Sequence, residues 1–330
     1  MKRNKKKNCR NSFFVFLLAI FFISSFQNIT LIASDAGMSS PSPINKIKNN
    51  KNLIKIGHYQ LDTEPGNFKN NLAKLVDALV EVDKQDIKIV SFPESFLTGY
   101  FSSAEKARKN SFAIDSPEIK ELLNKTKNIK AMFMVGFNEM RGEELYNTVL
   151  VAEQGKLIGS YSKAFPGYGY FTPGRKFPVF EKDGVKFGVI ICSDGGFIEP
   201  ARILALKGAS IIFAPHYNYI KPKSLINHFQ LVRSDHIARA IENSVWFVRG
   251  NNVNLGKDKG LEYDGIGYGD SYIVDPLGEI VVRSQRNVET LISYSINAEF
   301  TISLPGLKTR SEIGAKELGK ILMQTIKENK

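Results

Sequence analysis

The chain has 330 residues, of which 43% are hydrophobic and 24% are charged. This is the composition of a folded protein, and it excludes a disordered, collagen-like or multi-span membrane protein. The net charge of +12 suggests a polyanionic partner, but residues 1–34 carry six basic residues and no acid, which is half of that excess. The rest of the chain has no basic stripe with interleaved aromatic residues, so we expect no nucleic-acid partner.

The first 36 residues have the form of an export signal. After the basic start, residues 13–23 form an unbroken apolar run of 11 residues, about half the length of a helix that crosses a bilayer. Polar residues end this run, and small residues such as Ala33 and Ala36 suit a signal peptidase. We therefore expect residues 1–36 to be the signal peptide of an exported protein, periplasmic or secreted. The alternative is an uncleaved membrane anchor, and in both cases the leader is the only membrane contact that we expect.

The remainder is expected to form one α/β domain, because strands alternate with helices and hairpins without a change in composition. Residues 37–52 indicate a flexible spacer, 53–300 the domain, and 301–330 a tail with an amphipathic helix at about 311–327. Strands are expected at 53–59, 87–92, 131–137, 145–152, 156–162, 185–191, 210–214, 245–250, 269–274, 279–283 and 289–295, and a hairpin that turns at Asp183-Gly184 is expected to lead into 185–191. Helices are expected at about 68–82, 117–127, 199–206 and 225–243.

Cysteine usage singles out one thiol. Cys9 lies in the leader, so Cys192 is the one cysteine of the exported part. It has no partner for an internal disulfide, and an unpaired thiol is a liability in an oxidising compartment unless it has a function. The alternative is that Cys192 is a small buried hydrophobic residue. The sequence contains no HExxH, Cys/His cluster, P-loop or dinucleotide fingerprint, so we expect no metal and no cofactor.

Three chemically active residues come directly after predicted strands: Glu94, Lys163 and Cys192. The ends of buried strands in an open α/β sheet bring side chains together in one crevice. There a carboxylate can take the proton of a thiol, and a fixed ammonium can stabilise the oxyanion that forms when sulfur attacks a carbonyl carbon. Each residue also has a structural alternative: Glu94 could cap a helix, Lys163 could lie on the surface, and Cys192 could lie in the core.

The segments around these residues resemble the nitrilase (carbon–nitrogen hydrolase) superfamily. FPESFLTGY is similar to its glutamate motif, YNTVLVAEQGKLIGSYSKAF to its lysine motif, and GVIICSDGGFIEPARILALKGASIIFAPH to its cysteine motif. ARAIENSVWFVRGNN and GDSYIVDPLGEIV then follow in the order and approximate spacing of the family. The likeness runs from residue 53 to about 295, and five motifs in order are much more specific than one alone.

The resemblance implies a four-layer α-β-β-α sandwich and a catalytic Glu-Lys-Cys triad, here Glu94, Lys163 and Cys192. Glu94 would act as general base and later as general acid, and Lys163 and the backbone N–H of Ser193 would bind the oxyanion. Cys192 would form a thioester acyl-enzyme that water hydrolyses. The family also implies a homodimer or larger homo-oligomer. Three further matches, expected to hold the turn of the nucleophile by hydrogen bonds, are Asp194, Glu199 and Arg202.

Departures from the family pattern bear on the substrate. The loop after Lys163 is short and lacks a glutamate that many members carry there. Ser193 and Asp194 are the amidase-like form, and Gly195 and Gly196 stand where carbamoyl-amino-acid hydrolases usually place an arginine. We therefore expect a small linear amide as substrate rather than a nitrile or a carbamoyl acid. The side chains expected to contact this substrate are Tyr100, Tyr168, His216, Tyr217 and Asn218.

Two other functions would use the same residues. An N-acyltransferase would pass the acyl group from Cys192 to an amine instead of to water. A catalytically impaired small-molecule binding module would keep the site but not turn substrate over. Analysis of the products with an added amine separates the acyltransferase from the hydrolase, and the reactivity of the thiol separates both from the binding module.

Overall fold

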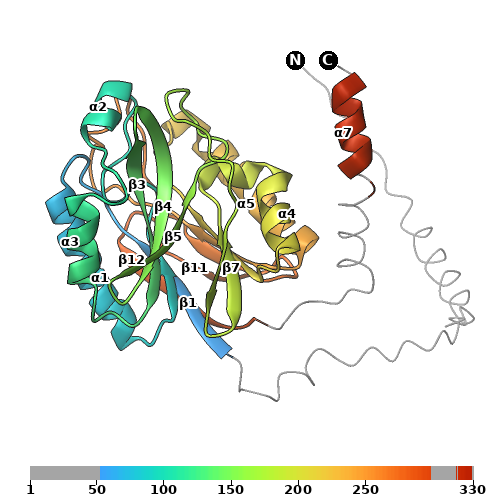
Figure 1. The fold of residues 1–330 in the computed structure, drawn as a ribbon, viewed down its shortest axis with the longest axis horizontal. Coiled ribbons are helices and arrows are strands. Elements are labelled where there is room, and N and C mark those ends of the chain that lie inside the picture. Colours follow the sequence, from blue (N-terminus) through green and yellow to red (C-terminus); the bar gives the residue numbers. More distant parts are fainter. Residues whose placement is uncertain (1–52, 299–316, 318, 329–330) are drawn as a thin grey trace, which may run out of the picture. The chain divides into compact units, whose positions relative to one another are not determined.

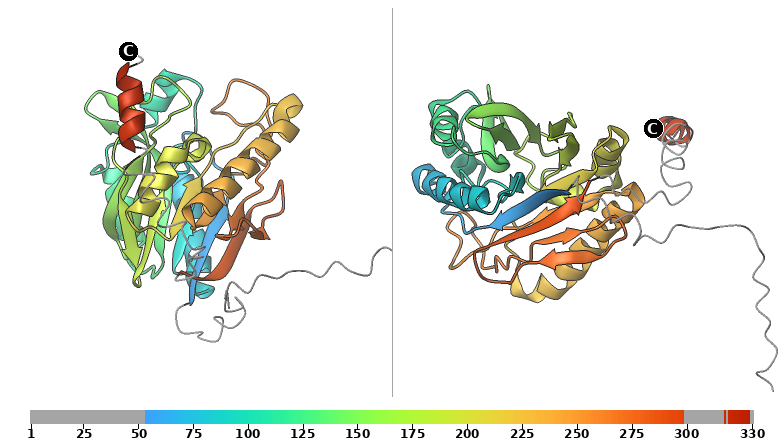
Figure 2. Two further views of the ribbon diagram at one scale, coloured as in Figure 1. Left: turned by 90° about the vertical axis from the view of Figure 1, so that its right-hand side faces the viewer. Right: turned by 90° about the horizontal axis from the view of Figure 1, so that it is seen from below.

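The computed structural model describes residues 53–298, 317 and 319–328. Residues 53–298 contain two six-stranded sheets that stack face to face, with helices on both outer faces (Figure 1). The strand order is β12-β1-β2-β3-β4-β5 in the first sheet and β11-β10-β9-β8-β7-β6 in the second. Figure 2 shows the same layers from two further sides. The expected four-layer α-β-β-α sandwich is therefore confirmed.

Each sheet is mixed. Parallel strands lie at its centre and antiparallel strands at its edges. The first sheet consists of β1 (Leu53–Gln60), β2 (Ile89–Ser91), β3 (Met132–Arg141), β4 (Glu144–Glu153), β5 (Lys156–Ser162) and β12 (Thr290–Asn297). The second consists of β6 (Val179–Lys182), β7 (Val185–Val189), β8 (Ile211–Pro215), β9 (Trp246–Gly250), β10 (Tyr272–Val274) and β11 (Ile280–Arg283).

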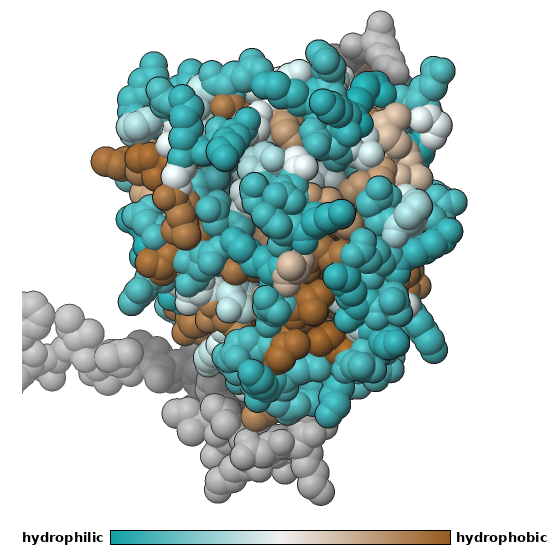
Figure 3. Space-filling view, turned by 90° about the vertical axis from the view of Figure 1, so that its left-hand side faces the viewer, coloured by the Kyte–Doolittle hydropathy of each residue, from teal (hydrophilic) through white to brown (hydrophobic). Residues whose placement is uncertain are grey.

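The helices enclose the sheets. Apolar residues of α1 (Phe68–Lys84) and α3 (Pro117–Lys125) pack on the first sheet, and α4 (Ile198–Leu206) and α5 (Leu225–Asn243) pack on the second. The outer surface over α1 and α3 is predominantly hydrophilic, with apolar side chains in small groups (Figure 3). The remaining described elements are α2 (Ala104–Lys109), 3-10 turns at Cys192–Gly196 and Pro222–Ser224, and α7 (Gly319–Glu328).

The core between the sheets follows from the alternation of side chains along the strands. Ile54 and Ile56 of β1 point to the same face, where they meet residues such as Phe187 and Val189 of β7. All four are buried, and burial of one such side chain contributes about 1.5–3 kcal/mol. A rigid double layer therefore supports the loops at the strand ends.

The predicted elements correspond closely to the observed ones, with two differences. Helix α2 was not expected, because only Ala107 of its six residues is buried and no apolar period marks it. The strand expected at 269–274 is reduced to β10, because Gly269 and Asp270 adopt positive φ angles of 75° and 67°. The expected signal peptide (1–36) and the expected spacer (37–52) lie outside the described residues. The helix expected at about 311–327 overlaps α7 from residue 319 on, and most of its earlier part lies outside the described residues. Among the described helices, none is long and apolar enough to cross a membrane.

Candidate active site

Glu94 follows β2 and is completely buried. Its Oε1 accepts hydrogen bonds from Lys163 Nζ and Asn147 Nδ2, both at 2.6 Å, and its Oε2 accepts one from the backbone N–H of Tyr217 at 2.8 Å. An ionised carboxylate is an acceptor only, and here all three partners are donors. Glu94 is thus held as a carboxylate in the interior and caps no helix.

Lys163 follows β5, and its side chain is 2% exposed. Its backbone is fixed on both sides, because its N–H donates to the carbonyl of Asn147 and its carbonyl accepts from the N–H of Gly174. Burial lowers the pKa of Lys163, but the surrounding negative charges, that of Glu94 foremost, raise it, and the pKa ends well above its ordinary value. Lys163 is therefore a permanent cation and does not lie on the surface.

Cys192 opens a 3-10 turn immediately beyond β7 and has a φ of +48°, which is unusual for a residue other than glycine. The carboxylate of Asp194 fixes this turn through hydrogen bonds. It accepts hydrogen bonds from the N–H groups of Phe165 (2.8 Å) and Ile191 (2.9 Å) and from the hydroxyl of Tyr161 (2.7 Å). The turn directs the backbone of Cys192 away from the strand.

Ser193 presents its backbone N–H as a free donor in this turn: the N–H has no acceptor among the described residues, while its hydroxyl donates to the carbonyl of Phe165. A free N–H beside the nucleophile is the geometry that an oxyanion site needs. The two other residues expected to hold the turn do not do so. The side chains of Glu199 and Arg202 make no hydrogen bond or ion pair with any described residue, because both lie on α4, beyond the turn.

The thiol of Cys192 is protonated at neutral pH. Burial raises its pKa most, the charge of Glu94 raises it further, and the charge of Lys163 lowers it, which gives a value of about 11. A thiolate is the reactive form of cysteine. A reaction through this thiol would therefore need a base to take its proton, and Glu94 is a carboxylate whose charge affects the thiol.

Four of the five expected substrate contacts lie near the triad. The ring of Tyr100 is 5.6 Å from that of Tyr168 and 5.5 Å from that of Tyr217, so the three form an aromatic group. Burial raises the pKa of Tyr100 well above its ordinary value, while the charge of Lys163 lowers it and the charge of Glu94 raises it. Asn218 Nδ2 donates to Cys192 Sγ at 3.6 Å.

His216 lies elsewhere. Its Nδ1 donates to the carbonyl of Ala214, and its ring lies 5.0 Å from that of His236 on α5. The side chain therefore faces the helix layer instead of the triad, because it continues the alternation of β8, in which Ile212 and Ala214 also face that layer. Its backbone still serves the site, since its carbonyl accepts the N–H of Glu94.

Sequence reasoning missed two buried residues of the site, Asn147 and Arg249. Asn147 donates to Glu94, and Arg249 donates to the side chain of Asn218. Both are polar residues that stand next to apolar residues within a strand, Asn147 in LYNTV and Arg249 in WFVRG, and a polar residue at a buried strand position is the signal that could have identified them. In the described part of the chain, no group of three or more His, Cys, Asp or Glu residues could hold a metal ion.

Comparison with known proteins agrees with this geometry. The model of the carbon–nitrogen hydrolase family matches residues 55–305. The chain belongs to the carbon–nitrogen hydrolase family. It is 31% identical over 243 residues to a nitrilase of Pyrococcus abyssi, covering 72% of this chain and 87% of the relative. It is 29% identical over 238 residues to an (R)-stereoselective amidase of a Pseudomonas species, covering 71% of this chain and 82% of that amidase.

Solved structures of the family share the fold. An amidase from Nesterenkonia sp. superposes with a TM-score of 0.61 at 21% identity, covering 78% of this chain and 95% of the amidase. The catalytic chemistry of a carbon–nitrogen hydrolase, cleavage of a C–N bond, is consistent with a carboxylate, an ammonium and a thiol gathered at the strand ends of this chain.

Proposed function

We propose that this protein hydrolyses a linear amide to an acid and ammonia or an amine, through a thioester on Cys192. The observation that carries the proposal is the buried contact of 2.6 Å between Glu94 and Lys163 beside a thiol whose pKa is raised to about 11. A carboxylate without a fixed cation could not stabilise an oxyanion, and a thiol without a base would not attack at neutral pH.

In the first half of the reaction, Glu94 takes the proton of Cys192 as Sγ attacks the amide carbon. The electron pair of the C=O bond moves to oxygen, and the resulting oxyanion binds Lys163 Nζ and the N–H of Ser193. The C–N bond then breaks, and Glu94 returns the proton to the leaving nitrogen. Ammonia or an amine departs and leaves the thioester.

In the second half, water attacks the thioester carbon while Glu94 takes a proton from it. The tetrahedral intermediate uses the same two oxyanion donors, and its collapse breaks the C–S bond. Sulfur recovers the proton as a thiol, and the acid is released. If an amine took the place of water, the same residues would transfer the acyl group, which is the acyltransferase alternative.

Two features support an amide as substrate. The backbone turn after Cys192 is Ser193-Asp194-Gly195, and no arginine from this turn offers a clamp for a substrate carboxylate. The tyrosines at positions 100, 168 and 217 provide aromatic faces with one buried hydroxyl, that of Tyr217, already hydrogen-bonded to Asp258. Such a surface suits a small neutral acyl group.

The test is release of ammonia by the purified protein from a panel of small aliphatic and aromatic amides, with the matching nitriles and N-carbamoyl acids as comparison. We expect turnover of amides, and its loss in Cys192→Ala. Cys9→Ser is the matched control, since it removes the other cysteine and should keep full activity. Full activity of Cys192→Ala would refute the mechanism. Hydroxamate formation with added hydroxylamine, faster than release of acid, would favour the acyltransferase.

A structure of a glutamate-to-glutamine mutant of the Nesterenkonia amidase shows covalent addition of the acetamide moiety of fluoroacetamide at the active site cysteine. Fluoroacetamide is therefore a suitable probe of the thiol here. We expect mass spectrometry to find a single adduct on the peptide that contains Cys192. A catalytically impaired binding module would give no adduct and no ammonia from any amide.

Export and self-association are further proposals. The basic and apolar pattern of residues 1–36 supports export, which detection of a processed N-terminus in the periplasmic or secreted fraction would test. Exposed apolar side chains on α4 and α5, such as Ile198 and Leu231, support a homodimer. Sedimentation of the wild type and of Leu231→Glu tests the dimer, and an unchanged monomeric mass in both would exclude it.

A further inference from the structure

Arg249, on β9, is a buried cation that forms no ion pair with a carboxylate in the part of the chain that the structure describes. The residue is 1% exposed, and its guanidinium donates to four neutral oxygens: the carbonyls of Gly269 and Asp270, the hydroxyl of Tyr268 and the side chain of Asn218. Its Nε has no partner among the described residues. Burial of a charge without an ion pair is strongly unfavourable, which indicates that this arginine has a function beyond packing.

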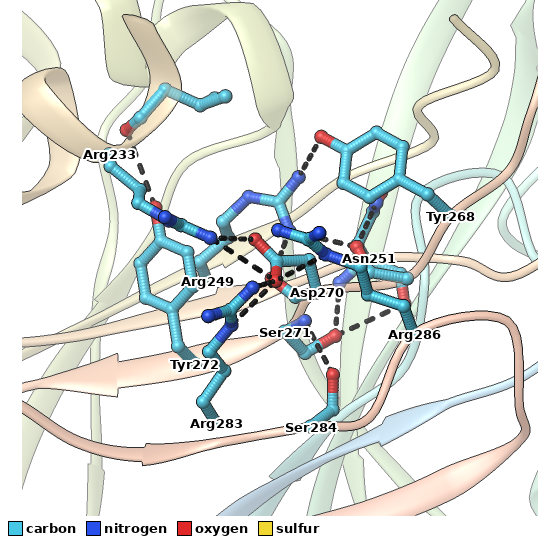
Figure 4. A network of polar contacts seen from close by, with 12 residues as sticks. Arg233, Arg249, Asn251, Tyr268, Asp270, Ser271, Tyr272, Arg283, Ser284 and Arg286 are labelled. Carbon is cyan, nitrogen blue, oxygen red and sulfur yellow. Dashed lines mark hydrogen bonds and ion pairs between the residues drawn. The ribbon is translucent and has the colours of Figure 1, made fainter. Parts of the chain in front are cut away.

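The carboxylate of Asp270, a residue whose carbonyl binds Arg249, is paired with other arginines. Figure 4 shows the side chain of Asp270 surrounded by Arg233, Arg283 and Arg286, each of which forms an ion pair with it. Arg249 reaches the backbone carbonyl of Asp270 instead, at 2.6 Å. Its guanidinium is thereby directed along the sheet toward the strand-end loop that carries Asn218, and not toward the carboxylate.

Asn218 connects this cation to the nucleophile. Its Oδ1 accepts from Arg249 at 2.7 Å and from the hydroxyl of Tyr268 at 3.4 Å, and its Nδ2 donates to Cys192 Sγ at 3.6 Å. The opposite orientation of the amide would set its NH₂ group against the guanidinium, donor against donor. Arg249 therefore determines which end of the Asn218 amide faces the sulfur.

The backbone of Asn218 is fixed as well. Its N–H donates to the side chains of Asn251 at 3.1 Å and Asn252 at 2.7 Å, both just beyond β9. The amide group is thus held at its backbone and at its oxygen, and its remaining donor is aimed at Cys192. A preorganised donor of this kind becomes stronger when its acceptor gains negative charge, as sulfur does when it loses its proton.

We infer that Arg249 is a positioning residue for the nucleophile: through the amide of Asn218 it places an N–H donor on Cys192 Sγ and stabilises the sulfur as Glu94 removes its proton. The inference rests on the proposed function, because it assigns a task within that reaction. The positive charge of Arg249 polarises the Asn218 amide from its oxygen end, which makes the N–H a better donor. Arg249 itself touches neither substrate nor sulfur.

The first test is Asn218→Asp. This isosteric change gives Arg249 a carboxylate partner, so we expect an unchanged or raised melting temperature. It also replaces the N–H donor at Cys192 with a negative charge, so we expect kcat to fall roughly 100-fold with little change in KM. The rate of alkylation of Cys192 by iodoacetamide at pH 8 should fall as well. Full activity of a folded Asn218→Asp protein overturns the inference.

The second test compares the same conservative change at two arginines. Arg249→Lys keeps the charge, but one ammonium cannot serve Asn218, Tyr268 and two carbonyls together, so we expect kcat to fall about 10-fold. Arg283→Lys is the matched control, because Arg283 binds Asp270 but does not reach Asn218. Equal effects of the two changes, or wild-type kcat in Arg249→Lys, overturn the inference.

The alkylation rate of Cys192 allows failure of the positioning role to be distinguished from failure of the proposed function. Iodoacetamide reports the state of Cys192 whether or not any amide is turned over. If the wild type hydrolyses no amide, the proposed function fails. If Asn218→Asp and Arg249→Lys then also leave the pH profile of alkylation unchanged, the positioning role fails separately.

Discussion

The Nζ of Lys163 lies 2.6 Å from Oε1 of Glu94, and neither side chain is more than 2% exposed. Removal of one partner from a buried pair leaves an uncompensated charge in the interior, which typically costs about 3–5 kcal/mol. Both members of the pair are therefore needed for the stability of the fold, in addition to their roles as base and cation in the proposed mechanism.

Lys163→Met should lower the free energy of unfolding by about 3–5 kcal/mol in urea titrations. The double change Glu94→Gln and Lys163→Met removes both charges and should recover much of that loss, while both proteins lack amidase activity. Lys74→Met is the control: its ion pair with Glu289 is 40% and 32% exposed, so its loss should change stability by less than about 1 kcal/mol. Equal losses for Lys163→Met and Lys74→Met would contradict a buried pair.

The pH dependence of Cys192 alkylation should depend on the charge of Glu94. Because the pKa of the thiol is raised to about 11, the rate of alkylation should increase about tenfold per pH unit between pH 7 and 10. Glu94→Gln removes the charge that raises this pKa and leaves Lys163, which lowers it. The variant should thus be alkylated faster than wild type at pH 8, although it should lose turnover of amides.

That experiment is done in a Cys9→Ser background, so that Cys192 is the single thiol. A slower alkylation of Glu94→Gln at pH 8 would mean that Glu94 activates the resting thiol instead of keeping it protonated. The opposite changes of alkylation and turnover are the distinctive result, because general damage to the site would lower both.

Gly195 should tolerate no side chain. A Cβ at this position would lie 2.9 Å from Nε2 of His236, a buried ring on α5 that cannot move away freely. Gly195→Ala should therefore shift the turn of Cys192 and lower both stability and kcat. Gly196→Ala is the matched control, since its Cβ would meet only the Asp235 carboxylate, at 3.7 Å. Equal melting temperatures and kcat in the two variants would show that the turn does not depend on this contact.

Sequence analysis predicted the triad because its members stand where strands end, and that position alone implies convergence. It did not give a role to Asn147 or Arg249, although both lie in motifs that were identified. A polar residue inside an apolar strand indicates a buried contact but does not name the partner. The partner of Arg249 is Asn218, 31 positions earlier on another strand end, and only the pairing of β8 with β9 brings the two together.

The orientation of His216 was missed for a related reason. His216 continues the alternation of β8, so its ring faces α5. Beyond it the alternation ends, because the consecutive residues Tyr217 and Asn218 both contact the triad. A one-residue shift of register inverts which residue faces the site. The sequence identified the loop correctly, and the strand register decided which of its side chains face the triad.

The four histidines of the chain, three of them buried (His58, His216 and His236) and one half-buried (His228), are held as neutral rings, which predicts acid sensitivity. Burial lowers the pKa of His58 to about 3 and that of His228 to about 4, and it lowers the pKa of His216 and of His236 well below the ordinary value. In the unfolded chain each ring titrates near 6.5. As the pH falls below about 6.5, the unfolded state binds protons that the folded state does not, so stability is lost.

Each fully buried histidine should lower the free energy of unfolding by about 1.4 kcal/mol per pH unit below 6.5. Urea titrations at pH 7, 6 and 5 measure this slope before most carboxylates titrate. His58→Gln, which keeps a polar group near Ser91 and the carbonyl of Asn251, should reduce the slope by one proton. If the free energy of unfolding of the wild type does not change between pH 6 and 5, or if its pH dependence is the same in His58→Gln, these rings accept protons in the folded state.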